Sequence, residues 1–236
     1  MRRVGLLHDI DLEVREGEVL GVAGLMGSGR TELLRALFGA DPIDGGRILL
    51  DGRPVALASP ACAIRRGIAL VPEDRKEQGL VLEMAIRENI TLAGLSAVSS
   101  FGWVRRGAER SAAEGYVRDL RIRASSTEGR VSDLSGGNQQ KVVLAKWLFT
   151  GARVLLFDEP TRGIDVVAKA EVYDLLARLA AEGKAVVIVS SEMPEVFGLS
   201  DRIAVLHEGR LAGVLSRAEA TQEAILRLAT GQGVRA

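Results

Sequence analysis

The stretch GVAGLMGSGRTELLRALFGA, residues 21–40, constrains the fold of this chain more than any other. The apolar run Val19–Ala23 enters it as a predicted strand, and the pattern RTELLRALF leaves it with leucines on one helical face. Glycines between the two allow conformations that turn successive backbone N–H groups inward, and the helix adds the positive end of its dipole. The stretch therefore predicts a strand, a phosphate-binding loop and a helix, in that order.

The loop follows the phosphate-binding pattern with one departure. Gly24 is followed by four residues, Gly29, a basic residue and Thr31, but the basic residue is Arg30 where the pattern has lysine. Thr31 offers a hydroxyl to Mg²⁺. A dinucleotide-binding loop is excluded, because Glu32 stands where that pattern needs glycine or alanine. The loop alone leaves a tight strand-to-helix turn as the alternative. The predicted nucleotide-binding residues are Gly24, Leu25, Met26, Gly27, Ser28, Gly29, Arg30, Thr31 and Glu32.

The rest of the chain predicts an α/β fold. Buried apolar runs in RRGIALVPED, RVLLFDEP and AVVIVSSE read as strands, the last two each followed by a helical pattern, which favours a mostly parallel sheet covered on both faces. Hairpins are expected in residues 6–24 around a turn at Glu16–Gly17, in GGRILLDGRPV and in DRIAVLHEGRLAGVL, with a helix after the last. From Glu73 to Lys146 strand signals are absent and helical segments dominate, so an inserted helical subdomain is expected.

Composition and charge exclude several classes of protein. Lys plus Arg and Asp plus Glu both number 31, so no general attraction to nucleic acid or anionic lipid is indicated, although local patches remain possible. No apolar run reaches the roughly 18 residues that cross a bilayer. The N-terminus has two arginines but soon meets Asp9, Asp11 and Glu13, so it is not interpreted as a signal peptide. Any membrane role is therefore expected through a partner. The single Cys62 suits a reducing cytoplasm and is interpreted as a packing residue.

The strand RVLLFDEP ends in two acids that suit a nucleotide site. Asp158 at the strand tip is expected to hold a metal ion through water, and Glu159 to polarise an attacking water. Alone, a strand ending in Asp-Glu-Pro is equally a helix entry. After a phosphate-binding loop, the pair is a much stronger signal.

A third element, LSGGNQQK, places two glycines at the start of the helix NQQKVVLAKWLF. Such a helix N-terminus attracts an anion. One ATP does not need two of these within one chain, so the second is expected to serve a phosphate bound on another copy of the fold. A capped helix with a flexible entry is the alternative. The residues assigned to this signature are Leu134, Ser135, Gly136, Gly137, Asn138 and Gln139.

These elements resemble the ATP-binding domain of ABC transporters, from about Leu7 to Gly231. GLMGSGRTEL, VPEDRKEQGLV, DEPTRGIDV and SSEMPEV are most similar to the second ATPase half of subunits that energise bacterial monosaccharide importers. The resemblance implies an ABC-type P-loop NTPase with an antiparallel β-subdomain and an inserted helical subdomain. Residues 1–236 then form one nucleotide-binding domain, with 1–72 and 147–236 as ATP-binding core and 73–146 as the helical subdomain.

The chain departs from that family in ways that weaken its own site. A planar guanidinium at Arg30 does not replace a compact ammonium. Ser191 stands where the family has its switch histidine, and Glu73 where it has a glutamine that touches metal and membrane partner. The aromatic residue that stacks on adenine is absent from Met1–Glu18, and its strand is expected upstream of Met1. The resemblance thus implies a degenerate site that binds nucleotide and hydrolyses it poorly.

The resemblance also implies cofactors and partners. ATP and Mg²⁺ are expected, with Thr31 and Asp158 at the metal, and Glu159 and Ser191 as catalytic residues. A second ATPase half is expected to meet Asp165 and the signature, and membrane-spanning permease subunits to meet Glu73. A sugar-binding protein acts indirectly, and the location is the cytoplasmic face of the cell membrane.

Two alternatives to an importer ATPase are a nucleotide-binding regulator that never turns over and an ABC-type ATPase of DNA repair or translation. Arg30 and Ser191 favour the first, and Glu159 weighs against it. The second requires long coiled-coil insertions or a basic surface, which the sequence lacks. Elsewhere, Trp103 and Trp147 are interpreted as packing residues, His207 as a hairpin residue, and RRGAER as a solvated face or a flank of the membrane-partner contact.

Overall fold

The computed structural model of the chain describes residues 1–232. By its internal contacts the chain divides into two compact units. The first unit comprises residues 1–70, 153–159 and 175–236, and the second comprises residues 71–152 and 160–174. Residues 160–174, which the sequence pattern groups with the ATP-binding core, therefore belong to the second unit. Each unit is described by itself below.

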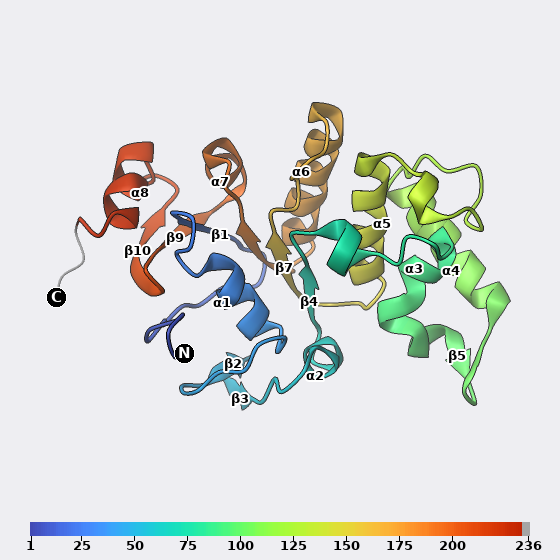
Figure 1. The fold of residues 1–236 in the computed structure, drawn as a ribbon, viewed down its shortest axis with the longest axis horizontal. Helices are drawn as coiled ribbons and strands as arrows, with labels where there is room; N and C mark the ends of the chain where they lie inside the picture. The colour runs from blue at the N-terminus through green and yellow to red at the C-terminus, as the bar shows by residue number, and fades with distance from the viewer. Residues whose placement is uncertain (233–236) are drawn as a thin grey trace. The chain divides into compact units, whose positions relative to one another are not determined.

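The first unit is built on a sheet whose strand order is β10-β9-β1-β8-β7-β4 (Figure 1). The strands are β1 Val19–Gly24, β4 Ile68–Val71, β7 Val154–Asp158, β8 Ala185–Val189, β9 Arg202–His207 and β10 Arg210–Ser216. Strand β1 pairs in parallel with β8 and β9, β8 pairs in parallel with β7, and β10 pairs antiparallel with β9. The predicted mostly parallel sheet is confirmed.

The central strands are apolar because both faces of the sheet are covered. Val22, Ile188 and Leu206 are completely buried. Helices α1 Arg30–Leu37, α7 Met193–Leu199 and α8 Gln222–Ala229 belong to this unit, and α6 Val166–Ala181 runs from the second unit into the first. The predicted helix after the glycine loop and the predicted C-terminal helix are confirmed.

One of the two hairpins expected in the first 60 residues is present in the first unit. The hairpin of β2 Ile48–Leu50 and β3 Arg53–Val55 is confirmed, and α2 Pro60–Arg65 is capped by Ser59. The hairpin expected in residues 6–24 is wrong, because no strand precedes the turn at Glu16–Gly17. Asp9 has a left-handed backbone (φ 51°), which interrupts the extended conformation, and the segment makes only isolated bridges.

The second unit is mainly helical. Its helices are α3 Ile86–Thr91, α4 Arg106–Asp119 and α5 Gly136–Leu148, with a π-helix at Arg75–Gly79 and 3₁₀ helices at Leu92–Val98 and Val131–Asp133. It also holds a hairpin of β5 Ser99–Ser100 and β6 Trp103–Val104, so the expectation of no strands in this region is wrong. Two-residue strands are too short to leave a period in the sequence.

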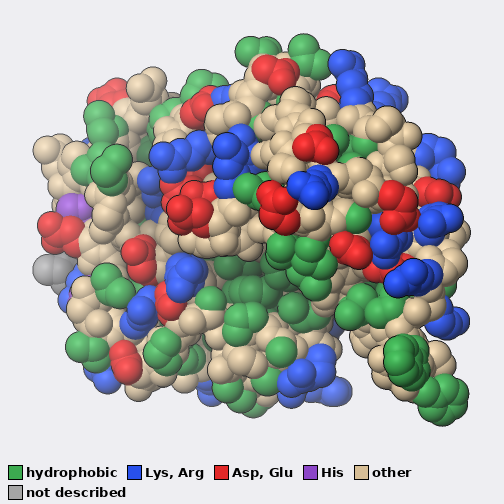
Figure 2. Space-filling view, turned by 45° about the vertical axis from the view of Figure 1, so that its right-hand side comes forward, with side chains coloured by type: hydrophobic (Ala, Val, Ile, Leu, Met, Phe, Trp, Pro, Cys, Tyr) green, Lys and Arg blue, Asp and Glu red, His purple; other side chains and the backbone are tan. Residues whose placement is uncertain are grey.

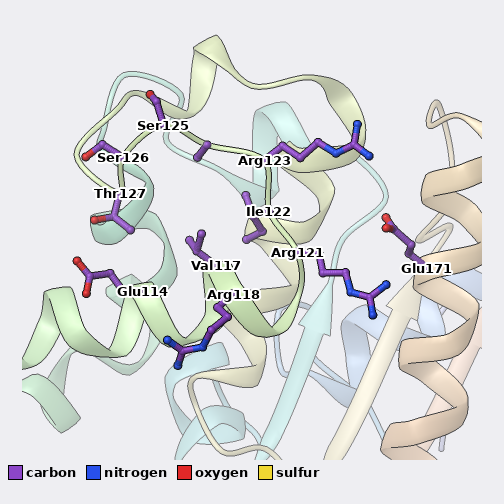
Figure 3. Close-up of a pocket in the computed structure, with 11 residues that line it drawn as sticks. Glu114, Val117, Arg118, Arg121, Ile122, Arg123, Ser125, Ser126, Thr127 and Glu171 are labelled. Atoms are coloured by element: carbon purple, nitrogen blue, oxygen red, sulfur yellow. The ribbon is translucent and has the colours of Figure 1, made fainter.

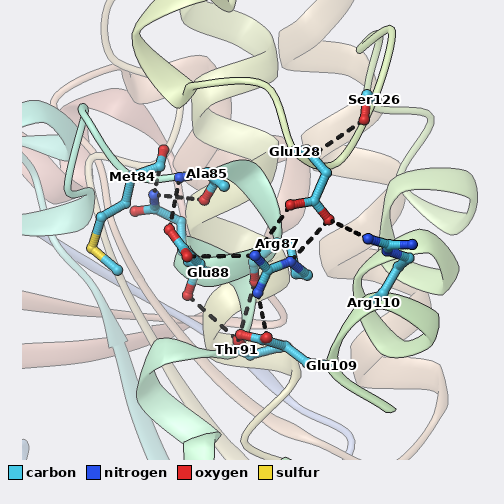
Figure 4. Close-up of polar contacts among 10 residues, drawn as sticks. Met84, Ala85, Arg87, Glu88, Thr91, Glu109, Arg110, Ser126 and Glu128 are labelled. Carbon is cyan, nitrogen blue, oxygen red and sulfur yellow. Dashed lines mark hydrogen bonds and ion pairs between the residues drawn. The ribbon is translucent and has the colours of Figure 1, made fainter. Parts of the chain in front are cut away.

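An ion network around the buried Glu109 joins α3 to α4 (Figure 4). Arg87 pairs with the buried carboxylate of Glu109 and donates to Glu128 at 3.1 and 3.2 Å, and Thr91 donates to Glu109 at 2.9 Å. The hydrogen bond to Glu128 is the main cause that raises the pKa of Arg87, and burial opposes the rise. The solvated face expected at RRGAER therefore holds for its arginines but is wrong for Glu109, which is 3% exposed.

The two tryptophans differ in their exposure to solvent. Trp147 on α5 is 8% exposed, so its predicted packing role is confirmed. Trp103 is 80% exposed, and the prediction that it packs is wrong, because it lies on a two-stranded hairpin with no layer over it. No helix in residues 1–232 has the length and apolar character needed to span a bilayer.

Candidate functional site

The glycine loop connects the end of β1 to the start of α1. Gly29 caps the helix with φ 98°, a left-handed backbone that favours glycine. A Cβ at Gly24 would lie 2.4 Å from Ser28 Oγ and 2.6 Å from the Leu206 carbonyl oxygen, so close approach also demands glycine there. Met26 at the loop tip is 98% exposed. The loop is therefore tightly folded at its base and open to solvent at its tip.

Ser28 is a buried polar residue within this loop. Its side chain is 4% exposed, and Oγ has no hydrogen-bond partner among residues 1–232. A buried hydroxyl without a partner is costly unless something satisfies it. Together with the free N–H groups at the start of α1, this unused donor fits a phosphate-binding loop rather than a simple structural turn.

Asp158 at the end of β7 faces the loop. Thr31 Oγ1 donates to Asp158 Oδ1 at 3.3 Å, and the carboxyl is 3% exposed. Burial raises the pKa of Asp158 to about 6, with the hydrogen bond from Thr31 opposing that rise. A hydroxyl and a carboxylate are the hard oxygen ligands that Mg²⁺ prefers. The two residues predicted to hold the metal are thus adjacent.

Glu159 lies in the middle of a second cluster. Ser191 Oγ donates to Glu159 Oε2 at 3.0 Å, and Arg30 Nη1 lies 3.9 Å from Glu159 Oε1. Arg30 Nη1 also donates to the carbonyl oxygen of Ser190 at 3.0 Å. Glu159 has φ 47°, a strained conformation for a non-glycine residue of the kind found at functional sites. The structure thus places both predicted catalytic residues in contact and directs Arg30 toward them.

The predicted signature residues lie at the start of α5 in the second unit. Ser135 precedes the helix and caps no backbone N–H; its exposed Oγ instead accepts from Asn138 Nδ2 at 2.9 Å. Asn138 Oδ1 accepts from the Arg123 backbone at 2.8 Å. Gln139 is buried and donates to the Val131 carbonyl oxygen at 3.2 Å. The first N–H groups of α5 therefore remain available to an anion.

Close packing explains both glycines of the signature. A Cβ at Gly136 would lie 2.9 Å from Arg75 Nη2, and a Cβ at Gly137 would lie 2.9 Å from Ala168 Cβ. Arg75 donates to the carbonyl oxygens of Arg162 and Gly163 at 3.0 and 3.4 Å. The sequence analysis missed Arg75, because its partners lie 87 and 88 residues away and no short pattern marks it.

The two predicted interface residues are both on the surface of the second unit. Asp165 Oδ1 accepts from the Ala168 backbone at 3.0 Å, and that hydrogen bond lowers the pKa of Asp165. Asp165 therefore caps α6. Glu73 forms an exposed ion pair with Arg162. His207, expected in a hairpin turn, ends β9 with Nδ1 2.8 Å from the Ala229 carbonyl oxygen.

The second unit also holds an open pocket (Figure 3). Its lining includes Arg121, Arg123 and Glu171, and the last pairs with Lys141 at 2.5 Å. None of the predicted site residues lines it. A phosphate-binding loop presents N–H groups at an open helix end, so a concave pocket is a poor guide to it.

Comparisons with known proteins agree with this geometry. Residues 7–162 match the family model described as ABC transporter. The chain is 51% identical over 231 residues to the ribose import ATP-binding protein RbsA of Geobacillus kaustophilus, covering 98% of this chain and 47% of that protein. It is also 51% identical over 232 residues to ribose import ATP-binding protein RbsA 1 of Streptomyces coelicolor, covering 98% and 46%. The chain thus spans about half the length of the curated relatives it matches.

Solved structures show the same fold. A nucleotide-free ATP-binding cassette from an ABC transporter aligns with a TM-score of 0.80 at 21% identity, covering 94% of this chain and 88% of that one. A dimeric bacterial ABC transporter cassette, MJ0796, aligns with a TM-score of 0.76 at 23% identity, covering 90% of each. With the family model matching most of the sequence and the cassette fold throughout, this chain belongs to the ABC transporter family.

Proposed function

We propose that the chain is the second nucleotide-binding half of an ABC sugar importer and couples ATP binding and hydrolysis to movement of membrane subunits. The observation that carries the proposal is the meeting of the glycine loop with the acidic strand end, at Thr31 and Asp158. The relatives named for ribose import support the sugar, and their greater length supports a second half beside this one.

In this proposal the loop Gly24–Glu32 binds the phosphates of ATP, and Thr31 and Asp158 hold Mg²⁺. The oxygen donors and the unused hydroxyl of Ser28 fit both groups. Mg²⁺, when bound, neutralises charge on the phosphate oxygens. Glu159 orients and polarises a water, and Ser191 fixes the Glu159 carboxylate by its hydrogen bond. Residues 1–72 and 147–236 serve as ATP-binding core in one domain with the helical part 73–146.

The chain's own site is degenerate in this account. Arg30 is held by the Ser190 carbonyl oxygen and lies beside Glu159, so its charge is directed at the catalytic carboxylate. Ser191 has a short neutral side chain where the family has an imidazole that carries a proton. The site therefore binds nucleotide and hydrolyses it slowly.

The surface around α5 serves a neighbouring ATPase half. Residues Leu134–Gln139 bind the nucleotide held by the partner's loop, and Asp165 lies at the same interface. Glu73 faces permease subunits, which hold the protein at the cytoplasmic face of the membrane and receive sugar from a binding protein. The dimeric MJ0796 cassette supports such pairing.

A calorimetric titration with ATP, in Mg²⁺ and in EDTA, tests nucleotide and metal binding without requiring turnover. Thr31→Val should reduce affinity in Mg²⁺ about tenfold and leave affinity in EDTA nearly unchanged, since one ligand is lost. Thr230→Val, at an exposed helix end, is the control. If wild type and Thr31→Val bind ATP with equal affinity in Mg²⁺, the assignment of Thr31 to the metal site is wrong.

A nucleotide-binding regulator without turnover is the second candidate, favoured by the contacts of Arg30 with Ser190 and Glu159. Turnover measured with the partner half separates the two functions. If the chain is an importer ATPase, its ATPase activity rises when the partner half is added. If it is a regulator, it binds ATP, and the activity of the pair is the same whether or not Glu159 and the signature are both substituted.

A further inference from the structure

The hairpin of β5 and β6 carries aromatic side chains into solvent. Phe101 is 100% exposed, Trp103 is 80% exposed, and Val104 is 38% exposed. Figure 2 shows hydrophobic side chains gathered on a projection at the lower right, where the β5 label lies in Figure 1. Large apolar side chains grouped at one exposed tip mark an interaction site more often than chance exposure does.

The backbone at the tip argues against a purely structural role for Phe101. Phe101 and Gly102 have φ 49° and 81°, a turn in which Asn-Gly is the favoured pair. A bulky aromatic at positive φ is strained, and here it contacts no layer that would compensate. Asparagine at position 101 would suit this turn better, so the hairpin itself does not account for the aromatic side chain.

Two arginines directly follow the hairpin. Arg105 caps α4 and Arg106 is its first residue, and cations at a helix N-terminus oppose the helix dipole. Both are exposed, and neither lies within ion-pair distance of a carboxylate in the part of the chain that the structure describes. The Arg105 guanidinium donates to the Ala97 carbonyl oxygen at 3.3 Å. The fold thus leaves two positive charges unneutralised beside the aromatic tip.

We propose that this hairpin, Ser99–Arg106, docks on the surface of an anionic lipid bilayer. Tryptophan and phenylalanine at a tip insert at the level of the headgroups, and adjacent arginines bind anionic lipid phosphates. The chain as a whole has no net charge, so the attraction is local to the hairpin. Lipid alone is the partner, and the inference stands or falls separately from sugar import.

Trp103 is a built-in reporter for this docking. The chain has two tryptophans, and Trp147 is buried while Trp103 is exposed. Vesicles of phosphatidylcholine alone and of an equimolar mixture with phosphatidylglycerol are the probes. The purified chain should show a blue shift of tryptophan emission and quenching by brominated lipid with the anionic vesicles only.

Two variants separate lipid contact from stability. Phe101→Asn should raise the melting temperature slightly, because asparagine suits the turn. It should weaken vesicle partitioning about tenfold or more, because the side chain that would insert into the bilayer is lost. The double variant Arg105→Glu and Arg106→Glu should leave α4 at least as stable and weaken partitioning at least about twentyfold, since each basic residue near an anionic surface contributes about fivefold. The matched control is the β2–β3 hairpin, with Leu49→Asn and with Arg47→Glu and Arg53→Glu, which should partition as wild type does.

Three results would overturn the proposal. One is an unchanged Trp103 emission with anionic vesicles. Another is that both hairpin variants partition onto anionic vesicles as wild type does, or that the β2–β3 control variants lose partitioning to the same extent. The third is Phe101-dependent self-association or binding to a permease protein in detergent without any binding to vesicles, which would assign the hairpin to a protein partner.

Discussion

Arg30 is the residue at which the proposed nucleotide site departs from the phosphate-binding pattern. Its guanidinium donates to the Ser190 carbonyl oxygen and lies 3.9 Å from Glu159. A lysine ammonium is a compact point charge on a flexible stem, whereas the guanidinium is planar and needs partners in its own plane. In the proposed site, the positive charge of Arg30 is therefore shared between the phosphates and the Glu159 carboxylate.

The first prediction concerns that residue. Arg30→Lys should tighten binding of Mg·ATP about tenfold, because a compact ammonium gains a charge-assisted hydrogen bond worth roughly 1.5–3 kcal/mol. Isothermal titration calorimetry measures the change. Arg35→Lys, whose arginine pairs with Asp41 on the same helix, is the control and should bind as wild type does. No gain, or a loss, would mean that the loop is adapted to arginine.

At the scale of single elements, α5 begins at the proposed signature and buries a lysine near its end. The helix begins at Gly136 in the signature and buries Lys146 near its last turn. The Lys146 ammonium donates to the Gly79 carbonyl oxygen and lies 4.9 Å from the centre of the Trp147 ring. Burial lowers the pKa of Lys146 from 10.5 to about 8.

The second prediction follows from this lysine. Between pH 8 and 10.5 the unfolded chain holds a proton on Lys146 that the folded chain has lost, so the free energy of unfolding should rise with pH across this window. The rise should total about 3 kcal/mol. In Lys146→Met the rise should vanish, and in the exposed-site control Lys76→Met it should persist. Chemical denaturation at pH 7 and pH 10 gives the comparison; the same rise in Lys146→Met and wild type would contradict it.

The third prediction concerns the glycine at the start of α5. Gly137→Ala places a methyl group 2.9 Å from Ala168 Cβ and should destabilise the second unit by about 1–3 kcal/mol through overpacking. Gly115→Ala in α4 meets no atom within 4 Å and should instead stabilise by about 1 kcal/mol. Thermal melting of both variants distinguishes the packing role from general helix propensity. Equal shifts of the same sign would show that Gly137 is not held by packing.

The sequence predicted the elements whose signal lies in neighbouring residues. The buried strands β1, β7 and β8 are continuous apolar runs, and the glycine loop has a fixed spacing. Residues 6–16 alternate in polarity as a strand does, yet Asp9 turns the backbone and this described segment forms only isolated bridges. Arg75 contacts residues that are far away in the sequence, and Trp103 is exposed because no other segment packs over it. Neither property can be read from a local sequence pattern.

At the scale of the whole molecule, the first unit holds the glycine loop and the second holds the helix proposed to carry the signature. One nucleotide needs a loop from one copy of the fold and a signature from another in the proposed pair. The fourth prediction is that the isolated chain is mostly monomeric and nearly inactive as an ATPase. Sedimentation and steady-state turnover test it, and robust turnover by the purified chain at micromolar concentration would contradict it.

The central claim is a division of labour between the chain's own site and the signature that it lends to a partner. The most direct test is transport and ATPase activity of the assembled importer in reconstituted vesicles, with Ser135→Arg, Gly137→Asp and Glu159→Gln compared singly. A bulky or acidic side chain in the signature would collide with or repel the partner's nucleotide. A positioned acid or base contributes about 10²–10⁴-fold only where hydrolysis occurs. The account predicts that both signature variants lose far more activity than Glu159→Gln. Abolition of transport and hydrolysis by Glu159→Gln, with the signature variants largely active, would show that Arg30 supports a working site.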